Sequence, residues 1–302
     1  MGFSYNARYG GELYQDGKNA RNAALGGLSV SYADGSNPVL LKDRNIPSIH
    51  FSHKNNFGSM ARVTILSYLH PGKKYPLYLG LTNRTVDKIP NTSSACDHST
   101  LECNYSEIDY FSQQEIGVQV STIRDWGPYT FGVNFKPNFT SLLEYKSYGF
   151  YTDLAVLFQP LDELDVTLLL EDIVGLKYWD TGTVETVSPL FMGGLHYRFS
   201  RFRAGLEIGS RISHPLTAHF ERNTMQYYHM GIEYKQQEQL FLRLGTSHAN
   251  QFTAGIGIRF QFIDYSYAYL HPYEGSPFEE SHIISAGINL EELHRIKDKI
   301  KP

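Results

Sequence analysis

Residues 202 to 212 alternate strictly between apolar and polar side chains. One face carries Phe202, Ala204, Leu206, Ile208 and Ile212, and the other carries Arg203, Gly205, Glu207, Gly209 and Arg211. No amphipathic helix gives this order, because a period of two belongs to an extended chain whose successive side chains point to opposite faces. The segment is therefore predicted to be a β-strand with one oily face and one polar face.

The same rule holds along most of the chain. We expect strands at 46–54, 59–69, 76–85, 107–123, 129–136, 148–159, 164–171, 191–199, 202–212, 228–234, 240–247, 252–260, 263–270 and 282–290. Their number, about fourteen, is even, as bacterial barrels of antiparallel strands require. Apolar side chains on every second position would then face lipid, and the polar or small ones would face the lumen.

Connection lengths give an independent signal. Connections after even-numbered strands are short, as at Ser200–Arg201, whereas the longer ones follow odd-numbered strands, as at 86–106, 137–145, 174–186, 213–223 and 271–280. Two short connections, 55–58 and 249–251, are exceptions on the second side. Outer-membrane barrels have short periplasmic turns and longer external loops.

These patterns predict an all-β fold, a transmembrane antiparallel β-barrel of about 14 strands with a short N-terminal plug. We expect residues 1–45 to be a periplasmic or plug segment, 46–290 the barrel and 291–302 a charged periplasmic tail, with both chain ends in the periplasm. A propeller would show a repeated blade sequence, which we do not find, and a soluble sandwich gives no reason for the loop parity.

The composition agrees with a barrel in the bacterial outer membrane, in contact with its lipid. The mean hydropathy of −0.34 is low because only alternate strand residues need be apolar. No run of about 18 apolar residues occurs, which argues against a transmembrane helix. The first residues lack the charged and apolar regions of a signal peptide, so we expect that an export signal has been removed.

Several functional classes are not expected from the residues present. A net charge of −4 offers no basic face for nucleic acid. The twelve His are scattered, so neither a metal site nor a catalytic triad is indicated. His229 beside Glu233 is better read as a pore-lining histidine than as a base. Asp264 is better read as a lumen carboxylate that pairs with a lumen arginine than as an acid. We expect no enzyme and no cofactor.

The two cysteines lie close together in one polar loop. In an oxidising compartment Cys96 and Cys103 favour a local disulfide over a metal site, because only His98 lies near enough to add a ligand.

Residues 19–45 break the alternation, with small residues, Gly26-Gly27 and then Asn37-Pro38-Val39. This segment is similar to the "AxLGGA…A-D…NPA" segment of the PorV/PorQ family, relatives of the FadL-type transporters, although Val39 replaces an alanine. Residues 253–269 also resemble the last hairpin of that family. The resemblance implies a plug motif at Gly26, Gly27, Asn37 and Pro38, and a role in type IX secretion.

Two functions remain from the sequence, ahead of a water-filled general porin, whose lumen the non-alternating entry segment would obstruct. The first is an accessory protein that docks a secretion translocon or a surface protein within a larger membrane complex. The alternative is a FadL-like transporter of a hydrophobic small-molecule ligand, which predicts an apolar pocket between plug and wall and a lateral opening.

Overall fold

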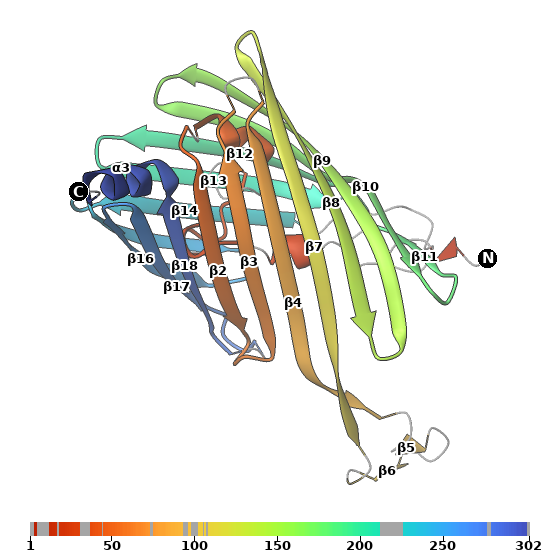
Figure 1. Cartoon of the computed structure of the whole chain (residues 1–302). Coiled ribbons are helices and arrows are strands. Elements are labelled where there is room, and N and C mark those ends of the chain that lie inside the picture. Colours follow the sequence, from red (N-terminus) through yellow and green to blue (C-terminus); the bar gives the residue numbers. More distant parts are fainter. Residues whose placement is uncertain are drawn as a thin grey trace.

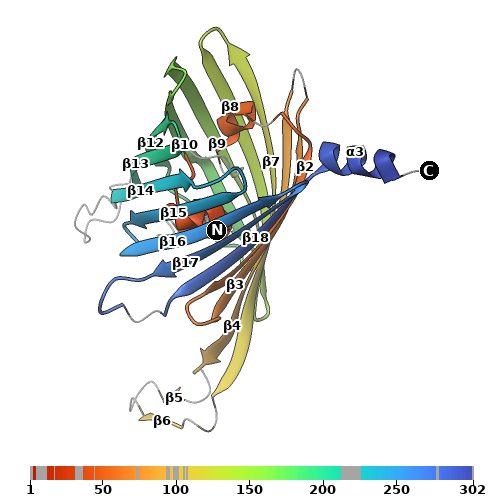
Figure 2. The ribbon, with the colours of Figure 1, turned by 90° about the vertical axis from the view of Figure 1, so that its left-hand side faces the viewer.

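The computed structural model is a closed antiparallel barrel with its N-terminal segment inside (Figures 1 and 2). It describes residues 3–4, 12–16, 18–30, 37–43, 45–72, 75–92, 96–97, 102–104, 106, 108–211, 226–276 and 279–300. The main sheet has sixteen strands, and without the short β1 and β11 fourteen form the wall. This confirms the predicted fold class.

The wall strands are neighbours in sequence order throughout. They are β2 (Ser48–Asn56), β3 (Ala61–His70), β4 (Leu77–Asn91), β7 (Asp109–Trp126), β8 (Tyr129–Leu142), β9 (Tyr145–Leu161), β10 (Leu164–Trp179), β12 (Leu190–Phe199), β13 (Phe202–Arg211), β14 (Gln226–Lys235), β15 (Leu240–Ser247), β16 (Phe252–Phe260), β17 (Ile263–His271) and β18 (Ser281–Asn289). The ring closes where β18 pairs with β2, from His282 opposite Asn55 to Asn289 opposite Ser48.

The remaining elements lie inside the barrel or at its rims. They are β1 (Phe3–Ser4), α1 (Glu12–Gln15), α2 (Ala20–Ala24), the 3-10 helix η1 (Pro38–Asp43), β5 (Cys96–Asp97), β6 (Glu102–Cys103), β11 (Val184–Thr186) and α3 (Leu290–Ile300). No helix within the described ranges has the length and apolar character needed to cross a membrane.

The two rims differ as predicted, but two of the predicted connections are shorter than expected. The turn rim carries the connections after β3, β7, β9, β12, β14 and β16, and the loop rim carries the others. The connection expected at 137–145 is mostly strand, since β8 runs to Leu142 and β9 begins at Tyr145. Likewise β10 continues to Trp179 through the start of the loop expected at 174–186. Pro137 suggested a break, but the alternation of inward and outward side chains continues past it.

The apolar faces point outward and the polar faces inward. On β15, Leu244 is 60% exposed on the outside while Arg243 is 5% exposed inside. On β8, Phe135 is exposed outside, and Asn134 and Lys136 are buried inside. An outer surface of this kind suits lipid rather than water, because water would leave a large apolar area uncovered.

The two ends of the chain lie at different rims, which corrects the expectation that both lie on one side. Phe3 and Ser4 of β1 pair with Val184 and Glu185 of β11, which itself pairs with the loop-rim end of β10. Helix α3 follows β18 at the turn rim, and Figure 1 shows N and C on opposite sides of the molecule. The N-terminal segment therefore enters from the loop rim and reaches the wall at β2 near the turn rim.

Candidate functional site

The N-terminal segment fills the middle of the lumen, and we call its described residues 12–16, 18–30 and 37–43 the plug. Helix α2 is capped at its N-terminus by Asn19, whose side chain accepts a hydrogen bond from the Asn22 amide. It packs on β15 to β18, while η1 packs on β4 and β7 to β9. Leu25, Leu28 and Val30, which follow α2 in the chain before η1, are fully buried. The plug therefore contacts opposite sides of the wall.

The Gly26-Gly27 pair of the predicted plug motif lies directly against the wall. Both glycines have positive φ, at 75° and 83°, which other residues adopt at a cost. A Cβ at Gly26 would overlap the Thr246 carbonyl and lie 2.5 Å from that of Met230. The sequence therefore needs glycine here for close approach as well as for conformation.

The wall strands also carry glycines where the plug contacts them. Gly231 and Gly245 pair across β14 and β15, and both point inward at this contact. A Cβ at Gly231 would lie 2.5 Å from the Leu25 carbonyl, and one at Gly245 would overlap the Gly26 nitrogen. Backbone therefore packs on backbone where the plug meets β14 and β15.

Carboxylates from the wall hold the plug on the same side. Glu207 of β13 is fully buried and accepts hydrogen bonds from the amides of Ser29 (3.0 Å) and Val30 (2.8 Å). Glu233 of β14 accepts two from Arg21, at 2.8 and 2.9 Å, and one from Arg243 at 2.8 Å. These contacts supply partners for charges that burial would otherwise penalise heavily.

Neutral hydrogen bonds complete this attachment. The Thr253 hydroxyl accepts from the Gly26 amide and donates to the Ala24 carbonyl, both at 2.9 Å. His229 donates through Nδ1 to the Gly26 carbonyl at 2.7 Å. His229 is therefore a plug contact, in agreement with a hydrogen-bonded histidine of the lumen.

Asn37 and Pro38 form the turn that starts η1. The buried Asn37 side chain donates to the Val30 carbonyl at 2.7 Å and accepts from the Val39 amide at 3.2 Å. Pro38 contacts β8 at Gly132, where a Cβ would lie 2.8 Å from the proline Cβ. The motif residues thus shape the plug and seat it on the wall.

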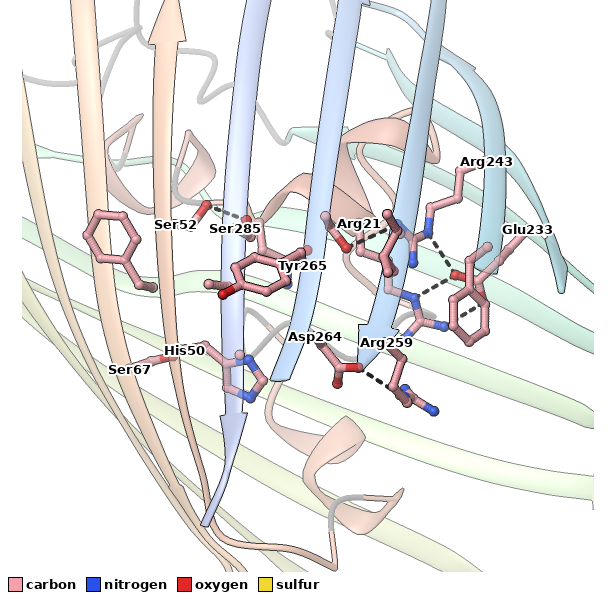
Figure 3. Close-up of a pocket in the computed structure, with 18 of the residues that line it drawn as sticks. Arg21, His50, Ser52, Ser67, Glu233, Arg243, Arg259, Asp264, Tyr265 and Ser285 are labelled. Atoms are coloured by element: carbon pink, nitrogen blue, oxygen red, sulfur yellow. Dashed lines mark hydrogen bonds and ion pairs between the residues drawn. The ribbon is translucent and has the colours of Figure 1, made fainter. Parts of the chain in front are cut away.

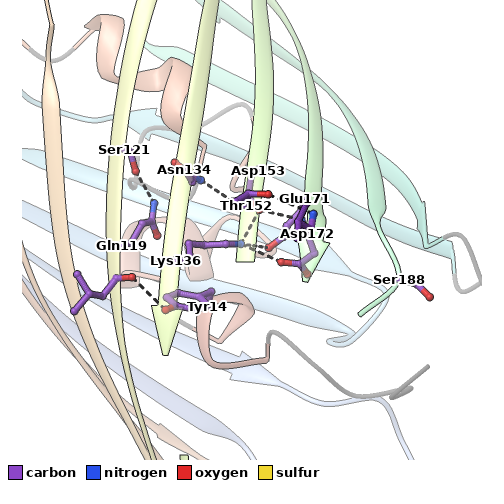
Figure 4. Close-up of polar contacts among 12 residues, drawn as sticks. Tyr14, Gln119, Ser121, Asn134, Lys136, Thr152, Asp153, Glu171, Asp172 and Ser188 are labelled. Carbon is purple, nitrogen blue, oxygen red and sulfur yellow. Dashed lines mark hydrogen bonds and ion pairs between the residues drawn. The ribbon is translucent and has the colours of Figure 1, made fainter. Parts of the chain in front are cut away.

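The opposite side of the lumen carries a buried charge cluster around Lys136 of β8 (Figure 4). Its ammonium lies 2.8 Å from Asp153 and 3.2 Å from Asp172, and all three side chains are almost fully buried. Asp172 sits in a bulge of β10 with φ of 56°, which turns its carboxylate inward, and its amide donates to Asp153. The cluster links β8, β9 and β10.

Tyr14 of α1 lies beside this cluster, at a weak point of the wall. The β7–β8 pairing skips Val118–Gln119 opposite Lys136–Pro137, and proline has no amide to donate. The Tyr14 hydroxyl donates to the Pro137 carbonyl at 2.6 Å and lies 3.2 Å from that of Val118. Burial raises the pKa of the Tyr14 phenol well above its ordinary value, so the hydroxyl remains a donor.

A cavity of about 210 Å³ opens between the plug and the turn-rim half of the wall (Figure 3). One part of its lining is apolar, from Leu40, Leu41, Ile65, Leu69, Tyr78 and Phe241. Another part is charged, from Arg21, Arg203, Lys235, Arg243, Arg259, Glu233 and Asp264. The cavity therefore offers an oily flank and a predominantly basic flank to the same occupant.

Asp264 and the two cysteines were singled out in the sequence, and the structure gives their positions. Asp264 lies in this cavity and pairs at 2.7 Å with Arg259, which also lines it, in agreement with the pairing to a lumen arginine that the sequence predicts. The strand register sets Cys96 directly opposite Cys103 across β5 and β6, but the disulfide itself stays a prediction. Within the described residues, no group of three or more His, Cys, Asp or Glu side chains is arranged to hold a metal ion.

Sequence reasoning missed the residues that attach the plug. Glu207 was placed on the polar face of its strand, but its partner was not identified, and Arg21 and Tyr14 were not singled out. A charged residue on an otherwise small or neutral lumen face was the available signal. Such a residue indicates that the buried charge has a partner, but it does not identify the residue that supplies it.

Comparison with known proteins gives similarity of fold only. No protein-family model and no curated protein matches the chain. The Pseudomonas putida toluene transporter TodX matches with a TM-score of 0.65 and 12% identity, over 91% of this chain and 99% of that one. The Ralstonia pickettii toluene transporter TbuX matches with 0.65 and 9%, over 91% and 99%. A Pseudomonas aeruginosa FadL homologue matches with 0.55 and 10%, over 90% and 98%.

The chain has a FadL-like barrel fold. Its fourteen strands, internal plug and apolar outer surface are those of a bacterial outer-membrane barrel, as predicted. The narrower resemblance to PorV and PorQ is not shown by these comparisons.

Proposed function

We propose that the chain is an outer-membrane channel for hydrophobic small molecules. The observation that carries this proposal is the cavity beneath the plug, whose walls come from the plug and the barrel together. An occupant there touches both the fixed wall and the segment that obstructs the lumen. Such a site can couple ligand binding to the position of the plug.

The packing of the plug argues against a general porin. Buried side chains fill the space between η1 and strands β9, β10 and β12: Val30, Val39, Leu40, Ala155, Leu157, Leu169, Leu190 and Met192. A second buried cluster joins α2 to β17 and β18. Hydrophilic solutes would need a continuous water-filled path, which a plug packed on both sides opposes.

The lining of the cavity indicates the kind of molecule that fits. Leu40, Leu41 and Phe241 provide apolar contacts for a hydrocarbon body. Ligand sites are commonly apolar with a few placed polar groups, and here those groups are mostly basic. The matched structures include transporters of toluene and a monoaromatic hydrocarbon channel, CymD, which supports an apolar substrate class.

Uptake into cells tests the proposal. The chain would be expressed in a Gram-negative host that lacks its own FadL-type channels, and uptake of radiolabelled toluene would be compared with that of a hydrophilic sugar. We expect saturable toluene uptake above the empty-vector level and no increase for the sugar. Equal uptake of both compounds would indicate a porin, and no increase for either would contradict the channel.

The secretion hypothesis receives less support. A translocon accessory protein also needs a stable barrel, so the fold does not distinguish the two functions by itself. The similarity to transport proteins favours the channel, and it agrees with a role other than catalysis. Recovery of a translocon or cargo protein with this barrel from native membranes would favour the secretion hypothesis instead.

A further inference from the structure

Helix α3 leaves the barrel at the turn rim as a capped and separate element. Its first turn is closed by Asn289, whose side chain accepts a hydrogen bond from the Glu292 amide at 3.1 Å. Figure 2 shows the helix running away from the end of β18, with the C-terminus as its outermost point. It thus projects outward from the wall rather than folding into the lumen.

The helix has one apolar face and one charged face. Leu290, Leu293 and Ile296 recur every three residues and fall on one side. Glu292 and Arg295 form an ion pair at 2.9 Å elsewhere on the helix, with the Arg295 side chain 69% exposed. Leu293 is itself 36% exposed although it lies on the apolar face.

A helix of this length is only marginally stable by itself in water. Helices shorter than about 12 to 15 residues are marginal without tertiary packing, and α3 has eleven residues. Its stability therefore depends on a surface that covers Leu293 and Ile296. In the described part of the chain, α3 packs on the end of β18, which leaves Leu293 partly uncovered.

The apolar face of α3 continues the apolar outer surface of the barrel. The outward face of β18 carries Ile284 and Ala286, and the same parity leads through Ile288 to Leu290 at the start of α3. Around Ala286 this face holds a groove of about 370 Å³, lined by Phe51, Ile256, Ile258, Tyr265, Ser266, Tyr267, Ile284 and Ser285. The apolar face of α3 is thus continuous with the lipid-facing surface of the wall.

We propose that α3 is an interfacial helix that lies on the phospholipid leaflet at the turn rim. Leu293 and Ile296 enter the boundary between headgroups and acyl chains, and Arg295 and Glu292 face water. Amphipathic helices bind in this way, with the apolar face buried roughly 5 to 10 Å into the interface. The helix would brace the seam at which β18 meets β2.

Spin labels on the two faces of the helix test this directly. Leu293→Cys and Arg295→Cys would each be made in the full chain carrying Cys96→Ser and Cys103→Ser, then labelled and reconstituted in phosphatidylethanolamine and phosphatidylglycerol vesicles. Collision of each label with oxygen, which enters lipid, and with a water-soluble nickel chelate is then measured. The two positions form a matched pair, because they lie two residues apart on opposite faces.

The label at 293 is expected to collide several-fold more with oxygen than with the chelate, and the label at 295 the reverse. Equal chelate access at both positions would place the helix in water and overturn the proposal. Shielding of position 293 from both reagents would mean that protein covers the helix, either a second copy or a periplasmic partner, and would also overturn it. The heat-dependent gel shift of folded barrels checks that both variants are folded.

Discussion

Arg21 of the plug and Glu233 of the wall are joined by two hydrogen bonds, at 2.8 and 2.9 Å, although 212 residues separate them in the sequence. The same carboxylate accepts a bond from Arg243 on the neighbouring strand. One buried acid thus holds a wall arginine and a plug arginine together. The plug is attached by charge on the side where its backbone also packs on glycine.

The first prediction concerns this shared carboxylate. Glu233→Gln removes the anion that pairs with Arg21 and Arg243, and with Arg203 at 3.8 Å. Breaking a buried ion pair costs about 3 to 5 kcal/mol. We expect weaker docking of the plug and faster hydrogen exchange of the amides in residues 18–30. Mass spectrometry of exchanged peptides in detergent measures this.

The matched control for Glu233 is Glu238 on the turn between β14 and β15. Glu238 itself is 88% exposed in its ion pair with Lys235, and pairs at the surface contribute little to stability. Glu238→Gln should leave exchange in residues 18–30 unchanged. Equal exchange in the two variants would show that the charge of Glu233 does not attach the plug.

The second prediction compares two glycines of the wall. A Cβ at Gly245 would overlap the Gly26 nitrogen, whereas one at Gly193 would meet only Leu168, at 3.7 Å. Overpacking costs about 1 to 3 kcal/mol, so Gly245→Ala should displace the plug while Gly193→Ala should not. Conductance in planar bilayers reads this out, with more frequent openings expected for Gly245→Ala alone.

The third prediction tests the buried lysine of β8. Lys136→Met removes the cation that pairs with Asp153 and Asp172, and among the described residues Asp172 then keeps only Arg211, at 3.7 Å. We expect a loss of about 3 to 5 kcal/mol in stability, because breaking a buried ion pair leaves uncompensated charge. The temperature of the gel shift from folded to unfolded barrel should fall. Lys146→Met, at an exposed position on the same hairpin, is the control and should unfold at the temperature of the parent chain.

The fourth prediction concerns the loop-rim hairpin of β5 and β6. Directly opposite residues in an antiparallel pair lie within reach of a disulfide. We expect the intact mass of the exported protein to be lower by two hydrogens than after reduction, with the linkage found in a peptide that joins Cys96 and Cys103. Alkylation of both thiols without prior reduction would contradict it.

The sequence predicts the wall well because period-two alternation is local. Each strand shows its own lipid-facing side, as Leu242 and Leu244 do on the side opposite Arg243. The even number of such strands predicts a closed barrel. The sequence does not encode lumen partners in the same way. Arg21 and Glu233 meet only because the barrel closes around the plug, and no spacing rule connects them.

Extensions beyond the predicted ends of the strands are also hard to see in the sequence. Pro137 looks like the end of a strand, because proline cannot donate to a sheet ladder. The structure continues the strand past it, with the Tyr14 hydroxyl near the interrupted pairing. The compensating residue comes from a segment that had been assigned only a general plugging role.

The last prediction tests which surface of the barrel faces lipid. Leu244 lies in the middle of β15 on the outer face, where arginine at the bilayer midplane costs about 2 to 4 kcal/mol in a barrel. Leu244→Arg should lower the free energy of unfolding in phospholipid vesicles by that amount, as measured by urea titration. Ala249→Arg, at an exposed position in the loop after β15, should have little effect because water solvates the new side chain. If both variants unfold at the same urea concentration, Leu244 does not face the hydrocarbon core, and the membrane-spanning assignment of β15 is wrong.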